Sequence, residues 1–216
     1  AAMGTLAAGV AHEINSPLAC VMANLDLAVM AVAERGEALG VSQEFREVLA
    51  ELREAREASA QIRNIVRDMK SFSRAAAEEA GPVEVQRVLD SALRMAANEI
   101  RHHAVLVKRY GETALALATE SRLGQVFLNL VVNAAHSIEE GRASSNEIRC
   151  STFMEPGGRV VIEIADTGVG MPPEVLERLF EPFFTTQSGG SGTGLGLSIC
   201  HRIVTGFGGT IDVQSE

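Results

Sequence analysis

The sequence predicts a chain of two parts: an antiparallel helical hairpin that pairs with a second copy in a dimeric four-helix bundle, followed by an α/β domain. Residues 1–80 are rich in Ala, Glu and Arg, and Pro17 is their one proline, which is a helical composition. After Gly81-Pro82 the composition changes. β-branched residues alternate over 160–164, and ten of the 20 glycines fall between 168 and 209. Gly81-Pro82 therefore marks the expected boundary between a domain over 1–80 and a domain over 83–216.

The first 80 residues carry two apolar stripes with helical spacing. Steps of three or four residues from Leu6 to Val32 predict one amphipathic helix, and near-heptad steps from Phe45 to Phe72 predict a second. A polar break near 35–42 separates them. Because two isolated helices have too little core to bury both stripes, we expect a homodimer in which a second hairpin completes the bundle.

The second domain is expected to combine a mixed sheet with helices. The spacing of its apolar residues predicts, in chain order, helices over 83–100 and 122–140, a strand over 159–165, helices over 173–180 and 197–207, and a strand over 210–213.

Composition and charge exclude several classes of protein. A content of 46% hydrophobic and 22% charged residues is typical of a soluble globular protein, and because no run of eighteen apolar residues occurs we expect no membrane-spanning helix. We expect no secretory signal, because the sequence has no basic segment followed by an apolar segment and a small-residue cleavage site. A net charge of −9 argues against a nucleic-acid partner. The three cysteines are far apart and odd in number, which predicts neither a disulfide framework nor a zinc site and fits a reducing cytosol.

His12 is the first candidate for chemistry. It lies two residues from Val10 and from Ile14, on the helix face opposite the apolar stripe, so it should be exposed. The neighbouring Glu13 can hold one ring nitrogen protonated and leave the other as a nucleophile. Pro17 should bend the helix just beyond it. The alternative is an ordinary solvated histidine.

A second candidate is a polar stripe on the helix over 122–140. Gln125, Asn129, Asn133 and His136 follow at spacings of four, four and three residues. Amide oxygens on one face can hold a hydrated Mg²⁺ together with the phosphates bound to it. The alternative is a helix face that is merely in contact with water.

Two glycine-containing segments complete the set. Asp166 opens the turn Asp-Thr-Gly-Val-Gly after the strand over 159–165, where its carboxylate can accept a hydrogen bond from an exocyclic amine; the alternative is a common Asp-Gly turn. The run 189–197 opens directly onto a helix, so its bare backbone donors can bind phosphate; the alternative is a flexible linker. It matches neither a Walker loop nor a dinucleotide fingerprint.

Taken in chain order, these segments resemble the H, N, G1, F and G2 boxes of two-component sensor histidine kinases. The matching segments are 11–17 (AHEINSP), 129–133 (NLVVN), 166–170 (DTGVG), 180–184 (FEPFF) and 192–196 (GTGLG). The resemblance covers nearly the whole chain. It implies a dimerisation and histidine-phosphotransfer domain followed by a catalytic domain, a two-layer α/β sandwich with a Bergerat-type ATP site.

The resemblance also implies roles for individual residues. His12 would accept the γ-phosphoryl group of ATP, and Glu13 would orient and deprotonate it. Asn133, with Asn129, would hold Mg²⁺, and Asp166 would bind the adenine amine. The remaining residues of the implied nucleotide site are His136, Gly168, Gly170, Thr186, Gly192, Thr193, Gly194, Leu195 and Gly196.

The implied function is ATP-dependent autophosphorylation on His12 and transfer to an aspartate of a response regulator. We expect a cytoplasmic kinase core whose sensor domain lies outside this sequence. Ser16, one helical turn after His12, stands where many relatives have Asn or Thr, so phosphatase activity toward the regulator should be weak.

Two other classes remain open. A signalling scaffold could bind ATP without transferring its phosphoryl group, but the intact His12, Glu13 and Asn133 argue against it. An ATPase of the gyrase, chaperone or mismatch-repair type would share the ATP site. That class requires a glutamate base within 129–133 and leaves the His12 hairpin unexplained.

Overall fold

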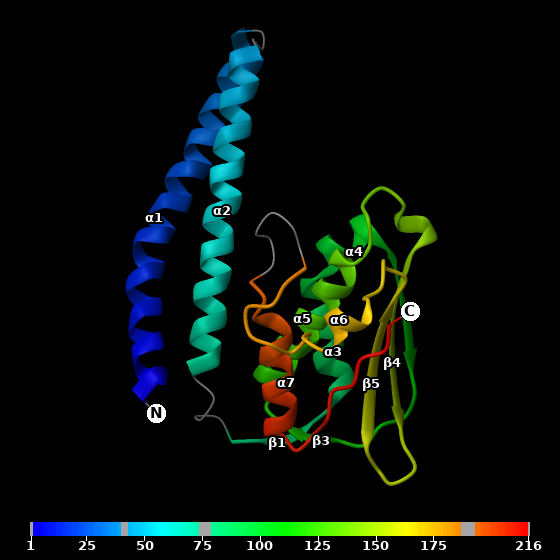
Figure 1. The fold of residues 1–216 in the computed structure, drawn as a ribbon. Coiled ribbons are helices and arrows are strands. Elements are labelled where there is room, and N and C mark those ends of the chain that lie inside the picture. The colour runs from blue at the N-terminus through cyan, green and yellow to red at the C-terminus, as the bar shows by residue number, and fades with distance from the viewer. Residues whose placement is uncertain (1, 40–42, 74–78, 187–192, 216) are drawn as a thin grey trace. The chain divides into compact units, whose positions relative to one another are not determined.

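The computed structural model describes residues 2–39, 43–73, 79–186 and 193–215 (Figure 1). Some side chains in the first helices, among them those of His12, Glu13 and Ser16, also lie outside the description. The chain forms two compact units, Ala1–Ala75 with Thr185–Thr193, and Ala76–Phe184 with Gly194–Glu216.

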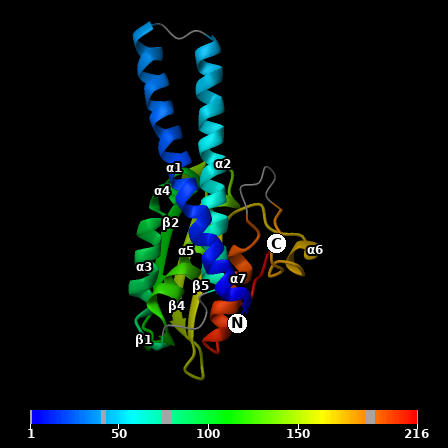
Figure 2. The ribbon, with the colours of Figure 1, turned by 90° about the vertical axis from the view of Figure 1, so that its left-hand side faces the viewer.

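The first unit is built on a hairpin of two long helices. Helix α1 spans Ala2–Leu39 and continues through Pro17, and α2 spans Gln43–Ser73. The two helices run side by side along the hairpin (Figure 2). Leu18 of α1 and Ser59 and Val66 of α2 are buried. The prediction of two helices is confirmed, but α1 is helical through 35–39, which is part of the polar break expected near 35–42.

The hairpin leaves apolar side chains in solvent. Ile14 and Val21 of α1 are 37% and 47% exposed, and Val48 and Ile62 of α2 are both 46% exposed. On each helix the two residues are a multiple of seven positions apart, so each pair lies along one side of its helix. One hairpin therefore has more apolar surface than its own two helices cover.

One window of α1 has the length and apolarity of a membrane-spanning helix. Pro17–Glu34 has a mean hydropathy of 1.5 over 18 residues, and 6% of the window is buried. The lack of an uninterrupted apolar run therefore does not by itself exclude a membrane-spanning helix. Asp26 and Glu34 interrupt the apolar run, yet Leu, Val, Met and Ala keep the mean hydropathy high. The core helix of a soluble bundle meets the same criterion.

The second unit is an α/β fold in which helices cover one face of a sheet (Figure 1). Strand β4 lies between β2, which runs parallel to it, and β5, which runs antiparallel; β1 and β3 form a separate antiparallel pair. The bounds are β1 Gly81–Val83, α3 Val85–Met95, α4 Ala97–His103, β2 Val105–Tyr110, β3 Ala116–Ala118, α5 Glu120–His136, a 3₁₀ turn Ala143–Ser145, β4 Glu147–Met154, β5 Val160–Asp166, α6 Pro173–Leu176 and α7 Gly196–Gly206. The predicted helical hairpin followed by an α/β domain is confirmed.

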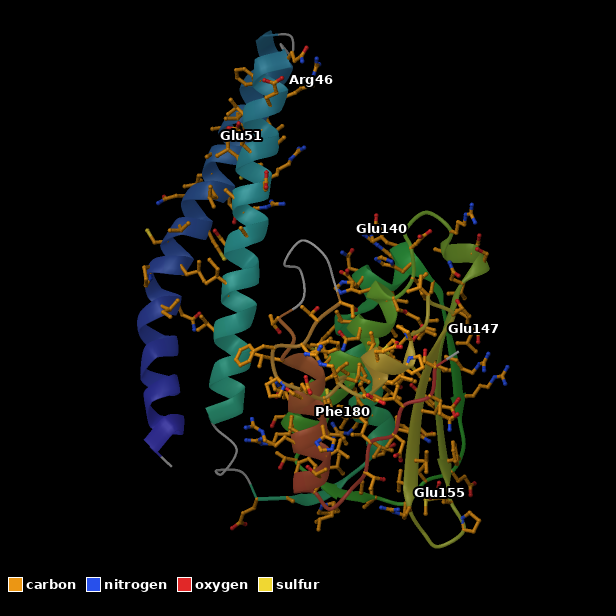
Figure 3. The ribbon with its side chains drawn as sticks, in the orientation of Figure 1. Arg46, Glu51, Glu140, Glu147, Glu155 and Phe180 are labelled. Carbon is orange, nitrogen blue, oxygen red and sulfur yellow. The ribbon has the colours of Figure 1, made fainter. Side chains whose placement is uncertain are left out.

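The core of this unit lies between the sheet and the helices. Along β4 the residues alternate, so Ile148, Cys150 and Thr152 are buried on one face while Glu147 and Arg149 lie on the other and pair with each other at 2.6 Å. Figure 3 labels Glu147 at the start of β4 and Glu155 just beyond its end. Asp166 pairs with Ile148 in the sheet, so it lies at the Glu147 end of the strand.

Four expected elements differ from the structure. The helix predicted over 122–140 ends at His136, and the helix predicted over 173–180 is the short α6, Pro173–Leu176. The helix predicted over 83–100 begins only at Val85, since Val83 belongs to β1, and it is interrupted at Ala96, which is 3% exposed and separates α3 from α4. The segment 210–213 has no strand pairing among the described residues, although Ile211 packs against the core. An extended segment becomes a strand only when it has a partner for its backbone hydrogen bonds.

A polar cluster joins α3 to the sheet. Asp90 accepts hydrogen bonds from Lys108 Nζ at 2.6 Å and from the Tyr110 hydroxyl at 3.0 Å. The hydrogen bond from Lys108 holds the pKa of Asp90 below its usual value, and burial raises the pKa of Tyr110. The cluster therefore stabilises the unit through a charged carboxylate.

The three cysteines are free thiols, as the sequence predicts. Cys20 on α1 is exposed, and Cys150 and Cys200 are buried in the second unit. Burial raises the pKa of Cys150 to about 11.

Candidate functional site

The carboxylate of Asp166 is held at the end of β5 by two donors. Its Oδ1 accepts hydrogen bonds from the backbone amide of Gly168 and from the hydroxyl of Ser137, both at 2.8 Å. Asp166 is exposed, and these two bonds occupy one carboxylate oxygen. The other oxygen, Oδ2, can accept a hydrogen bond from a ligand.

The turn after Asp166 packs tightly against the end of α5. A Cβ at Gly168 would lie 2.1 Å from Ser137 Oγ and 2.6 Å from its carbonyl oxygen, so only glycine fits there. The amide of Val169 donates to that same carbonyl at 3.0 Å. Gly170 has a φ of 70°, which also favours glycine. Two of the glycines predicted to line a base pocket are thus required by the backbone of the turn.

Thr167 attaches the other side of the turn to the start of β4. Its amide donates to the carbonyl of Glu147 at 3.2 Å, and its hydroxyl accepts from the amide of Glu147 at 3.0 Å. The hydroxyl also donates to Asn146 Oδ1 at 3.2 Å. The turn is therefore held from two elements, α5 and β4, which fixes where Asp166 stands.

A cavity of about 220 Å³ opens beside this turn. Its lining includes Ser137, Glu139, Arg142, Asn146, Thr167 and Gly168. A larger cavity of about 500 Å³ lies at the other end of the sheet, near Tyr110 and Gly111, and contains none of the predicted site residues. The hydrogen-bonded turn, rather than the larger volume, marks the candidate site.

Asn129 connects the polar face of α5 to α7. Its side-chain Nδ2 donates to the carbonyl of Gly196 at 3.4 Å, so its amide oxygen is available to a ligand. Asn133, one turn further along α5, is half-buried, and its side-chain amide has no hydrogen-bond partner within the described part of the chain. Both amides can therefore supply oxygen ligands.

His136 has a different partner. Its Nε2 pairs with Glu99 Oε1 of α4 at 2.8 Å, and its ring meets that of His103 edge to face at 6.2 Å. Asn129 therefore bonds to α7, whereas the His136 ring bonds to a carboxylate of α4.

The segment leading into α7 is fixed by Gly194 and Leu195. Gly194 has a φ of 64°, its carbonyl accepts from the amide of Phe183 at 2.8 Å, and a Cβ there would lie 2.4 Å from the Phe183 carbonyl carbon. Leu195 is 3% exposed and anchors the start of the helix. Gly196 then presents the first turn of α7, where unpaired backbone amides favour anions.

Several predicted site residues lie in or beside the parts of the chain that the structure does not describe. His12, Glu13 and Ser16 are in α1, but their side chains fall outside the described residues, and so does Gly192 entirely. Thr186 is exposed and Thr193 half-buried at the two ends of the undescribed segment 187–192.

Ser137 is a site residue that the sequence analysis missed. It follows Asn133 by four residues, as Asn133 follows Asn129, so the same helical spacing could have identified it. It lies inside the helix predicted over 122–140, whereas the structure makes it the C-cap of α5, just after the helix ends.

Two family models match the chain, one in each half. The His Kinase A (phospho-acceptor) domain matches residues 2–78, and the histidine kinase-, DNA gyrase B- and HSP90-like ATPase matches residues 118–216. The first match includes Pro17–Glu34, the apolar window of α1, and the second includes Asp166 and the polar face of α5.

Curated relatives align over essentially the full chain. The C4-dicarboxylate transport sensor protein DctB of Rhizobium meliloti is 34% identical over 217 residues, covering 100% of this chain and 33% of the relative. The sensor histidine kinase ZraS of Klebsiella oxytoca is 35% identical, covering 99% of this chain and 43% of the relative. The chain therefore spans less than half the length of these relatives.

Solved structures agree with the fold. Full-length ShkA in complex with AMPPNP is 27% identical, with a TM-score of 0.64 over 95% of this chain and 42% of that one. The histidine kinase AdeS of Acinetobacter baumannii has a TM-score of 0.58 over 95% of this chain and 91% of that one, at 20% identity, and supports the fold alone.

Proposed function

This chain belongs to the two-component sensor histidine kinases, and from that premise we propose that it phosphorylates His12 with ATP and passes the phosphoryl group to an aspartate of a response regulator. The observation that carries the proposal is the presence, in one chain, of a phospho-acceptor domain containing His12 and an ATPase domain containing Asp166. A nucleophile and a nucleotide site on separate domains are the parts that such a transfer needs.

The nucleotide site would be the region between Asp166 and the start of α7. The free Oδ2 of Asp166 would accept the hydrogen bond of the adenine amine, because Oδ1 is already occupied by Gly168 and Ser137. The amides of the first turn of α7 would bind the phosphates. Support comes from the matching ATPase family and from the AMPPNP bound to ShkA.

The donor set of α5 fits a magnesium ion held mainly by phosphate and water. Asn129 and Asn133 offer neutral amide oxygens, and no group of three or more His, Cys, Asp or Glu side chains among the described residues could hold a metal by itself. Mg²⁺ prefers oxygen ligands and keeps several waters. When bound there, it would neutralise phosphate charge during transfer.

The chemistry at His12 would follow from its neighbour. Glu13 would accept a hydrogen bond from one ring nitrogen, leaving the lone pair of the other nitrogen to attack the γ-phosphorus. The P–N bond would form as the bond from the γ-phosphorus to the oxygen of ADP breaks, and the ring proton would pass to Glu13.

We propose that the chain acts as a homodimer through the hairpin. Val21 and Val48, together with Ile14 and Ile62, are exposed in one copy, at the heptad spacing of a helical bundle. A second hairpin would bury them. The match of residues 2–78 to a phospho-acceptor domain supports this arrangement.

The partners follow from the family. A response regulator would dock on α1 near His12, where Ser16 would make its dephosphorylation weak, and a sensor domain elsewhere in the full protein would supply the signal. The kinase region would face the cytoplasm, where ATP and the regulator are available.

Incubation with γ-labelled ATP tests the function against its alternatives. Acid-labile label on the protein, lost in a His12→Gln chain, is the expected result. Release of free phosphate without labelled protein would identify an ATPase of the gyrase or chaperone type. Binding of ATP with neither product would identify a scaffold.

A further inference from the structure

We propose that Ser137 is a positioning residue that sets the preference for adenine over guanine by fixing the carboxylate of Asp166. The inference deepens the proposed function and rests on it, because it concerns the base that the same site accepts. It starts from the hydrogen bond of 2.8 Å between Ser137 Oγ and Asp166 Oδ1.

The Ser137 hydroxyl lies between two acceptors and has one proton. Besides Asp166 Oδ1, the carbonyl of Ala134 lies 2.8 Å from Ser137 Oγ. A hydroxyl can donate to only one of them at a time. Hydrogen bonds to an ionised carboxylate are roughly twice as strong as those to a neutral carbonyl, so the proton goes to Asp166 while that group is charged.

The bond decides which way the carboxylate faces. The amide of Gly168 and the Ser137 hydroxyl approach the same oxygen, Oδ1, from two elements of the fold. Two donors on one oxygen restrict rotation of the carboxylate, whereas a single donor from the following turn leaves it free to swing. With both bonds in place, Oδ2 stays directed away from them as a fixed acceptor.

A fixed acceptor discriminates between purines. Adenine carries a donor, the exocyclic amine, at the position where guanine carries a carbonyl oxygen. A carboxylate oxygen held in place binds the amine and repels the carbonyl. A carboxylate that can rotate away relieves that repulsion. Loss of the Ser137 bond should therefore lower the affinity for ATP and leave the affinity for GTP nearly unchanged.

Packing shows that Ser137 cannot simply move aside. Its Oγ, Cβ and carbonyl oxygen all lie within 2.6 Å of the point where a Gly168 Cβ would stand, and its carbonyl accepts the amide of Val169. Ser137 is therefore in van der Waals contact with the turn that carries Asp166. Removing only the hydroxyl oxygen tests the hydrogen bond while leaving the backbone contacts in place.

The experiment measures ATP and GTP binding by isothermal titration calorimetry with Mg²⁺ on the 216-residue chain, comparing Ser137→Ala with the parent. The control is Ser59→Ala, because Ser59 of α2 makes the same kind of local bond, to the carbonyl of Ala55 at 2.9 Å, and belongs to the other unit. We expect Ser137→Ala to lower the ratio of ATP to GTP affinity by about five- to tenfold, because a rotating carboxylate loses part of its hydrogen bond to the adenine amine. Ser59→Ala should leave the ratio unchanged.

An Asp166→Ala background separates positioning from general destabilisation. There the Ser137→Ala change should alter the ratio by less than about twofold, since no side-chain acceptor is left for Ser137 to position. An equal loss of ATP and GTP affinity in Ser137→Ala, or the same ratio change with and without Asp166, would overturn the inference. A parent chain that binds no ATP, or binds it equally well after Asp166→Asn, would instead overturn the proposed nucleotide site.

Discussion

Gly168 shows how a single residue constrains the candidate site. Its missing side chain leaves room for Ser137, which otherwise would stand 2.1 Å from a Cβ. Any larger residue must push the turn away from α5 and carry Asp166 with it. The glycine is therefore needed for packing, and its effect on a ligand is indirect.

Gly168→Ala should weaken ATP binding by about tenfold or more, because overpacking of this kind costs about 1–3 kcal/mol and is relieved by moving the turn. Calorimetric titration with ATP measures the effect. Gly206→Ala is the matched control, since a Cβ at Gly206 meets nothing within 4 Å. An unchanged ATP affinity in Gly168→Ala would show that the turn can shift without disturbing the site.

Asp90 gives a second prediction, on pH. Because its folded pKa is depressed by Lys108, its contribution to stability is present above the unfolded pKa and is lost as pH falls through the folded value. Asp90→Asn should lower the free energy of unfolding at pH 7 by less than about 1 kcal/mol, since the pair is partly exposed. The difference should begin to shrink as pH falls below the ordinary aspartate pKa of about 4, and it should vanish only below the depressed pKa of folded Asp90.

Urea unfolding of both chains at several pH values measures this effect. Asp212→Asn, at an exposed aspartate near the end of the chain, is the control. A stability difference between Asp90→Asn and its parent that persists unchanged in acid would mean that the charge of Asp90 is not what stabilises the cluster.

At the scale of elements, helices were more predictable from the sequence than strands. The apolar periods of α1, α2, α5 and α7 extend over several turns, so the sequence predicts these helices, although α1 continues to Leu39 and α5 ends at His136. Strands β1 and β3 have three residues each, too few for a period. Strand β2 meets its parallel partner β4 only after β3, α5 and the 3₁₀ turn. The break at Ala96 has no Gly or Pro to signal it, because buried alanines and tertiary packing decide it.

The sequence also predicts some residues of the candidate site and not others. Asp166, Asn129 and the glycines stand out because their residue types and spacing are unusual for core packing. Helical spacing could have identified Ser137, but its bond to Asp166 and the bond from Glu99 to His136 join elements that are distant in the chain, and no local pattern contains such bonds. The sequence therefore indicated which chemistry to expect but not the neighbours that orient it.

Val21→Asp tests the exposed apolar rows of the hairpin helices. Val21 is 47% exposed in one copy, so a charge there costs the isolated hairpin little, but burying it against a second copy should weaken the dimer by about tenfold or more. Sedimentation equilibrium measures the change. Val105→Asp is the matched control, because Val105 is 50% exposed on β2 of the other unit. Equal association of the two variants would place the dimer contact elsewhere.

At the scale of the whole molecule, the proposed nucleophile His12 lies in one unit, and Asp166 of the proposed nucleotide site lies in the other. His12→Gln should abolish phosphoprotein formation while ATP affinity changes by less than about twofold, because His12 and Asp166 belong to different compact units. Filter assays with γ-labelled ATP and calorimetric titration measure the two effects. Loss of ATP binding in His12→Gln would contradict the division. Mixing His12→Ala chains with Asp166→Asn chains then decides which subunit phosphorylates which.

The unequal burial of the three thiols makes the chain ready for site-specific labelling. Cys20 is exposed on α1, whereas Cys150 and Cys200 are enclosed by the second unit, and the pKa of Cys150 near 11 keeps it protonated. A nitroxide or dye carrying a maleimide should therefore attach at one position without any engineering of the sequence. In a homodimer the two labels would form a pair across the bundle, so electron–electron distance measurements could follow the hairpin during the phosphorylation cycle. Absence of a dipolar signal would indicate a monomer.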